Sequence, residues 1–180
     1  MNTLIQNYIG FEGRLNRQPF WIGAIVLTVI SVIILLLILQ LIGLNLMPGL
    51  PMIGGETNTA EIAALVNAAQ AKASWVNLVL LLIFLYPTAA ICIKRRHDRN
   101  NNGLDVWVYF VLAAIAQVIS ALGIGMTTMD LAGTTVPVPG PVTTTAAVIL
   151  GIYSIYLLVV LGFLKGTVGP NQYGADPLQG

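Results

Sequence analysis

Three short segments of this chain hold most of the side chains that are able to take part in ionic or acid–base chemistry. They read FEGRLNRQPFW at 11–21, KRRHDRNNNG at 94–103 and GTVGPNQYGADP at 166–177. Arginine forms planar, bidentate contacts with carboxylates and phosphates, and a histidine next to an aspartate is suited to proton transfer. The candidate site residues are therefore Arg14, Arg17, Arg95, Arg96, His97, Asp98, Asn171, Tyr173 and Asp176.

These residue types fit two non-catalytic roles and one catalytic role. In the first, Arg14 or Arg17 pairs with Asp98 or Asp176 and locks the C-terminal tail in place. In the second, the arginines bind lipid phosphate at a membrane surface. The alternative is an enzyme that acts on a lipid head group through Arg14, Arg17, His97 and Asp98. No Ser or Cys nucleophile lies in the three segments, and adjacent helical residues do not face one another. We therefore expect Asp98 to contact another segment, and we predict no catalytic residue.

A metal site is not expected from these residues. Catalytic zinc normally needs three protein ligands, and His97 is the one histidine in the sequence. Asp98, Asp176 and Glu12 are acceptable ligands for a hard cation, but the neighbouring arginines would repel it. We predict neither a metal nor a cofactor.

Four long apolar stretches connect the three segments, and none of them carries a charge. A helix needs roughly 20 apolar residues to cross a bilayer. The chain is 57% hydrophobic and 8% charged, whereas soluble domains contain about 25% charged residues. The sequence therefore predicts an all-α integral membrane protein, a four-transmembrane-helix bundle. Its spans are expected at about 20–46, 75–93, 106–129 and 143–164.

The distribution of basic residues predicts the orientation. Seven of the 8 lysines and arginines lie in the segments that four spans would place on one side, and Lys72 lies on the other. Short loops rich in Lys and Arg stay cytoplasmic, so both termini are predicted to be cytoplasmic. In a single membrane domain, 1–180, the inner segments would be 1–19, 94–105 and 165–180, and the outer loops 47–74 and 130–142.

The two predicted outer loops differ in character. In the first, Asn58 and Glu61 have the spacing of a capping box, and apolar residues follow on one helical face. This predicts an amphipathic helix that either lies on the outer surface or extends the second span. In the second, prolines at 137, 139 and 141 favour an extended connector. Pro87 predicts a kink within the second span.

The middle of each predicted span lacks ionisable residues. Such residues usually mark ion or proton pathways, so their absence weighs against a proton-coupled transporter. Gln117 is the most central polar residue, and we expect it to bond to a neighbouring helix. A small channel or transporter is the third hypothesis, after the accessory protein and the enzyme.

The three segments resemble the motifs of the small bacterial inner-membrane proteins grouped as domain of unknown function 805. The similar motifs are Phe11-x-Gly-Arg-x-Asn-Arg-x-x-Phe-Trp21, Arg95-x-His-Asp98 and Gly169-x-Asn-x-Tyr-Gly-x-Asp-Pro177. In the family pattern His-Asp is followed by a Ser-Gly-Trp turn, and this chain has Asn102-Gly103-Leu104 instead. The resemblance implies a multi-pass protein of the bacterial inner membrane and supplies no activity.

The leading interpretation is a non-enzymatic structural or accessory protein of the inner membrane. Its cytoplasmic Arg/His/Asp cluster would act as an ion-paired lock or as a lipid-phosphate site. The partners expected are the lipid bilayer, anionic phospholipid, and a homo-oligomer or a larger membrane complex. Nucleic acid is not expected, because basic residues are too few.

Overall fold

The computed structural model describes residues 7–41, 59–131 and 134–179. Within these ranges, four helices are long and apolar enough to cross a membrane. This confirms the helical, four-span class that the composition predicted. The helices are α2 (Arg17–Leu41), α3 (Thr59–Asp98), α4 (Leu104–Ala121) and α5 (Pro141–Leu158), and α5 continues into a π-helical turn, η1 (Val159–Phe163).

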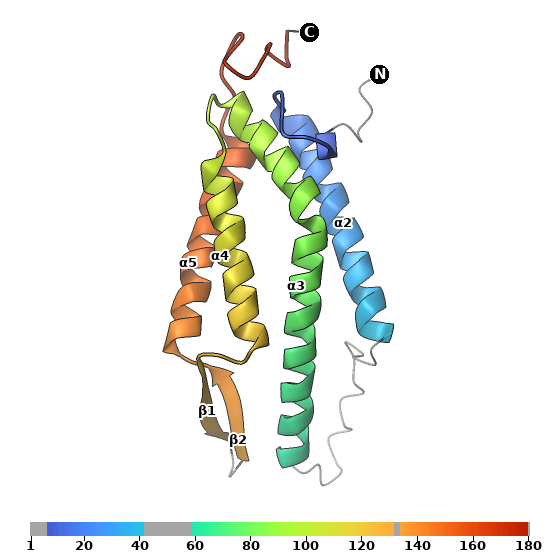
Figure 1. The fold of residues 1–180 in the computed structure, drawn as a ribbon, viewed down its shortest axis with the longest axis vertical. Coiled ribbons are helices and arrows are strands. Elements are labelled where there is room, and N and C mark those ends of the chain that lie inside the picture. The colour runs from blue at the N-terminus through green and yellow to red at the C-terminus, as the bar shows by residue number, and fades with distance from the viewer. Residues whose placement is uncertain (1–6, 42–58, 132–133, 180) are drawn as a thin grey trace.

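Figure 1 shows α2 lying along α3, and α4 lying along α5. The described chain begins and ends at the same end of the bundle, which we call the termini end. A turn at 99–103 connects α3 to α4 at this end. The chemistry-bearing segments before α2, between α3 and α4, and after η1 therefore come together there.

The buried core also lies toward the termini end. Leu15 and Phe20 pack there with Ile91 and Ile93 of α3 and Leu161 of η1. Farther along the helices many large apolar side chains are exposed, including Ile33, Leu37, Leu82, Ile115 and Ile152. Exposed apolar surface on spanning helices suits contact with lipid. The bundle is thus packed most closely where the polar segments meet.

The third span ends earlier than predicted. Helix α4 stops at Ala121, whereas the apolar run continues to Met129. Gly123 and Gly125 both adopt positive φ angles, a conformation that favours glycine and is incompatible with a continuing helix. The prediction of a span to Met129 is therefore wrong.

A β-hairpin follows α4, where a plain connector was expected at 130–142. Strand β1 (Met126–Leu131) pairs antiparallel with β2 (Thr134–Pro139), with Thr127 opposite Val138. The threonines and valines of these strands favour extended structure. Prolines are tolerated in a two-stranded ribbon, because each strand has an unpaired edge.

Helix α3 is longer at both ends than the second span that was predicted. It begins at Thr59, so the helix expected in the first outer loop forms the first turns of α3. This is the second of the two alternatives that the sequence left open. Asn58 and the predicted end of the first span at 42–46 lie outside the described residues. Pro87 lies within α3, and Figure 1 shows the helix changing direction along its length.

At its other end, α3 continues through the basic segment that was predicted to form a loop at 94–105. Arg95, Arg96 and His97 lie in its last turn, and the helix ends at Asp98. Cations are favourable at a helix C-terminus, and the side chains of these residues are buried against other segments. The prediction of a loop was therefore wrong for residues 94–98, which form the end of α3.

Candidate functional site

The turn between α3 and α4 is held by its own asparagines. The Asn101 side chain accepts a hydrogen bond from the N–H of Gly103 at 2.9 Å, and Asn102 accepts one from Leu104 at 3.1 Å. Gly103 has a φ of 74°, in the region that favours glycine. The turn returns the chain directly into α4 and leaves the end of α3 facing the other two segments.

Asp98 lies at the centre of the site, between two arginines from different segments. Its Oδ1 accepts from Nε and Nη2 of Arg14 at 3.2 and 3.1 Å. Its Oδ2 accepts from Nη1 of Arg95, one helical turn earlier. The side chains of Arg14, Arg95 and Asp98 are 1%, 0% and 4% exposed. Two buried cations thus share one buried carboxylate, which we call the Asp98 triad.

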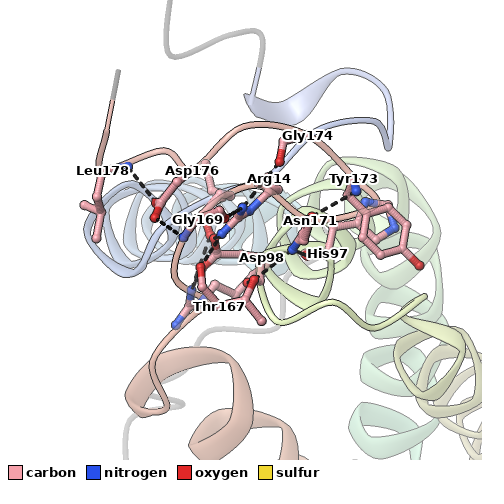
Figure 2. A network of polar contacts seen from close by, with 12 residues as sticks. Arg14, His97, Asp98, Thr167, Gly169, Asn171, Tyr173, Gly174, Asp176 and Leu178 are labelled. Carbon is pink, nitrogen blue, oxygen red and sulfur yellow. Dashed lines mark hydrogen bonds and ion pairs between the residues drawn. The ribbon is translucent and has the colours of Figure 1, made fainter.

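The remaining donors of Arg14 hold the C-terminal tail. Its Nη1 donates to the carbonyl of Gly169 at 2.6 Å, and its Nη2 donates to the carbonyl of Thr167 at 2.7 Å. Figure 2 shows this guanidinium between Asp98 and the tail. One side chain therefore joins the segment before α2, the end of α3 and the tail.

Arg95 joins α3 to the end of the fourth span. Its Nε donates to the carbonyl of Leu161 at 2.8 Å, and its Nη2 donates to that of Leu164. Its Nη1 also reaches the carbonyl of Leu15 at 3.4 Å. A fully buried guanidinium is costly unless its donors are paired, and these contacts pair them.

Three further side chains donate to carbonyls of the π-helical turn. Arg99 reaches Val160 at 3.4 Å and Trp21 reaches Gly162 at 3.1 Å. Arg17 reaches Phe163 at 3.3 Å. With Arg95, all five carbonyls from 160 to 164 accept from side chains of other segments. The last carbonyls of a helix lack internal partners and carry partial negative charge, so these donors cap the fourth span.

The tail closes the end of α3 in the same way. The N–H and hydroxyl of Thr167 donate to the carbonyl of Asp98 at 2.8 and 3.0 Å. The Asn171 amide donates to the carbonyl of His97 at 2.9 Å. The tail is therefore fixed by the backbone of α3 as well as by Arg14.

Asp176 shapes the tail itself. Its carboxylate accepts from the N–H of Leu178 at 3.0 Å and from that of Gly169 at 2.8 Å. These hydrogen bonds, and secondarily the charge of Arg14, lower the pKa of Asp176 below its ordinary value. No arginine of the described residues forms an ion pair with it.

His97 faces away from the carboxylate next to it in sequence. Its ring stacks on that of Tyr173, with centroids 3.8 Å apart and planes 3° from parallel. Its Nδ1 lies 3.2 Å from the carbonyl of Gly13, so Nδ1 carries the proton in this contact. His97 and Asp98 do not form an acid–base pair, because the Asp98 carboxylate is turned toward Arg14 and Arg95.

A second ion pair, which was not predicted from the sequence, lies beside the Asp98 triad. Arg96 contacts both oxygens of Asp105 in α4, at 3.1 and 3.0 Å. The hydroxyl of Tyr156 donates to the same carboxylate at 3.2 Å, and that of Tyr153 to its backbone carbonyl at 2.7 Å. Asp105 thus joins α3, α4 and α5. A lone carboxylate in the first turn of an apolar helix was the available signal.

The predicted site residues therefore divide into groups. Arg14, Arg95 and Asp98 form the triad, Asn171 holds the tail on the end of α3, and Asp176 shapes the tail itself. His97 and Tyr173 stack beside it. Arg96 pairs with Asp105 instead, and Arg17 is exposed and contacts no carboxylate of the described residues. No group of three His, Cys, Asp or Glu side chains in the described part of the chain has the geometry to hold a metal ion.

A family model described as "Protein of unknown function (DUF805)" matches residues 8–175. The chain belongs to this family. The resemblance seen in its motifs is thereby confirmed. The match covers all four spans, together with the triad and most of the tail.

Two proteins from Escherichia coli K12 are also similar to this chain. "Uncharacterized protein YiiR" is 27% identical over 175 residues, which cover 97% of this chain and 90% of the relative. "Inner membrane protein YhaI" is 28% identical over 113 residues, 61% of this chain and 69% of the relative. No solved structure matches the chain. With its four apolar helices, this DUF805 protein is a multi-pass protein of the bacterial inner membrane.

Proposed function

We propose that this DUF805 protein is a non-enzymatic structural or accessory protein, in which the Asp98 triad locks the tail onto the bundle. The observation that carries the proposal is that one buried carboxylate binds two buried arginines from different segments. Breaking a buried pair by removing one partner costs about 3–5 kcal/mol, because a charge is left uncompensated. Such a triad is suited to holding the segment before α2, the end of α3 and the tail in one fixed arrangement.

The locked tail would give the protein a rigid surface for a protein partner. Arg14 holds the carbonyls of Thr167 and Gly169, and Asn171 holds the last turn of α3. A segment that is already ordered loses little conformational entropy when a partner binds. The partner is either a second copy of this chain or another membrane protein.

The enzyme alternative finds no support in the geometry. Both oxygens of Asp98 are bound by arginines, and the ring of His97 is stacked and hydrogen-bonded. A general base has to reach the proton that it removes, and neither group is positioned for this.

The proposal places the termini end in the cytoplasm. Arg17, Arg99 and Lys165 lie there with the other basic residues, and Lys72 lies far from them in α3. The positive-inside rule supports this orientation.

The test is the protein mass of the particle purified in mild detergent from its native membrane. We expect a mass above that of one 19.2 kDa chain, from a second copy or from a co-purifying protein. Asp98→Asn should lower this mass, because Arg14 loses the carboxylate that holds it in place beneath the tail. Glu12→Gln is the matched control, since Glu12 is exposed and lies two residues from Arg14. A bare monomer in the unmodified protein, or an Asp98→Asn particle of unchanged mass, would contradict the proposal.

A further inference from the structure

A cavity of about 280 Å³ lies between the start of α2 and the tail. Its lining includes Arg95 and Asp98 of the triad and Asp176, together with Asn16, Arg17, Lys165, Val168 and Leu178. Sites for drug-sized ligands usually measure 300–1,000 Å³. This cavity is therefore of a size for a head group and not for a whole lipid.

Two cations that line this cavity, Arg17 and Lys165, lie outside the Asp98 triad. Lys165 is exposed and donates to no described residue. Arg17 is also exposed, and one of its five N–H groups donates to the carbonyl of Phe163. The two residues lie near opposite ends of the sequence, and both line this cavity.

The acidic residues on the cavity wall do not cancel these charges. Asp98 is neutralised by Arg14 and Arg95. Asp176 stays ionised, but its single negative charge is offset by the triad, which has two arginines for one carboxylate. The unpaired charge at the opening is therefore positive, and Arg and Lys are the residues that bind phosphate oxygens.

The position of the cavity points to lipid as the source of the phosphate. Arg17 is the first residue of the first span, and Lys165 follows the last residue of the fourth by two positions. Both therefore lie at the depth of lipid head groups.

Asn16 supplies a further feature of the site. Its Oδ1 is buried and has no hydrogen-bond partner among the described residues. Buried acceptors without partners are uncommon and unfavourable. A head-group hydroxyl in the cavity would supply the missing donor.

We propose that this cavity binds the head group of an anionic phospholipid, with its phosphate on Arg17 and Lys165. A glycerol-type head group fits best, because it carries a phosphate and hydroxyl donors. This inference goes beyond the accessory role and uses cations that the Asp98 triad leaves available.

Native mass spectrometry of the purified full chain in detergent tests it, with phosphatidylglycerol as the probe. Each basic residue near a membrane surface contributes about 1 kcal/mol to binding of anionic lipid, so Arg17→Gln with Lys165→Gln should weaken binding about 30-fold. Lys165→Gln alone should weaken it about fivefold. That variant removes no contact within the described chain, so it keeps the test valid if the double variant fails to fold.

Arg99→Gln with Lys72→Gln is the matched control. It removes the same charge, and neither residue lines the cavity, so binding should remain within twofold of the unmodified protein. Phosphatidylcholine should bind at least tenfold more weakly than phosphatidylglycerol, and millimolar inorganic phosphate should not displace the lipid. Equal binding of the two lipids, or unchanged binding in Lys165→Gln, would overturn the proposal. Displacement of the lipid by inorganic phosphate would show that the site binds a soluble phosphate, and would overturn the proposal that the phosphate belongs to a lipid.

Discussion

Gly166 lies against the carboxylate of Asp98, so closely that a Cβ atom at Gly166 would lie 2.0 Å from Oδ2. Gly166→Ala should therefore displace the carboxylate from Arg95 and destabilise the protein by at least about 2 kcal/mol. Gly151→Ala is the control, because nothing lies within 4 Å of its Cβ position. Alanine in a helix is favoured over glycine by about 0.5–1 kcal/mol. In SDS unfolding, Gly166→Ala should lower the free energy of unfolding and Gly151→Ala should raise it. Small changes of similar size in both variants would show that Asp98 is not held tightly.

The ion pair of Arg96 and Asp105 should contribute separately to the joining of α3, α4 and α5. Asp105→Asn leaves Arg96, which is 9% exposed, without a charged partner, and should cost about 1–2 kcal/mol. Tyr156→Phe removes one exposed hydrogen bond and should cost about 0.6 kcal/mol. SDS unfolding of both variants measures the difference. Equal losses in the free energy of unfolding for the two substitutions would show that the charge of Asp105 does not contribute to stability.

The tail should loosen in acid. Asp176 has a lowered pKa in the folded protein, so its hydrogen bonds stabilise the tail above the unfolded pKa of about 3.9. That stabilisation is lost as the pH falls through the folded pKa. Amide resonances of Gly169 and Leu178 should keep their positions from pH 7 to 5 and shift below about pH 4.

Asp176→Asn provides the comparison for this titration. The shifts of Gly169 and Leu178 in the variant should no longer follow a carboxyl titration. If the same titration persists in Asp176→Asn, another group controls the tail.

Reporter fusions test the orientation. A C-terminal fluorescent protein that folds only in the cytoplasm should fluoresce, and a phosphatase active only in the periplasm should be inactive there. The same phosphatase inserted at Asp130, in the hairpin at the opposite end, should be active. The reverse pattern at both positions would place the termini end outside.

Much of the fold could be predicted, because charge-free runs of about 20 residues have few alternatives in a membrane protein. The fourth span was predicted at 143–164 and is found at Pro141–Phe163. The third span was predicted too long, because hydropathy depends on residue type alone and does not reveal that Gly123 and Gly125 have positive φ angles. Local backbone conformation, and not apolarity, ends that helix.

The candidate site could be predicted as a group of residues but not as a set of contacts. Topology alone brings Arg14, Asp98 and the tail to one end. Asp98 pairs with Arg14 and not with Arg17 because of where each arginine lies relative to the end of α3. These positions could not be predicted from the sequence. Asp105 was missed because its partner Arg96 was assigned to a loop, and only the continuation of α3 directs Arg96 toward α4.

The most direct test of the lock is a double-mutant cycle on Arg14 and Asp98. Arg14→Gln, Asp98→Asn and the double variant are unfolded with SDS, and the coupling free energy is calculated from the four stabilities. Two buried groups 3.1 Å apart should couple by about 1.5–3 kcal/mol, with the double variant less destabilised than the sum of the single ones. Free energies that add to within about 0.5 kcal/mol would show that the two residues act independently and would contradict the lock.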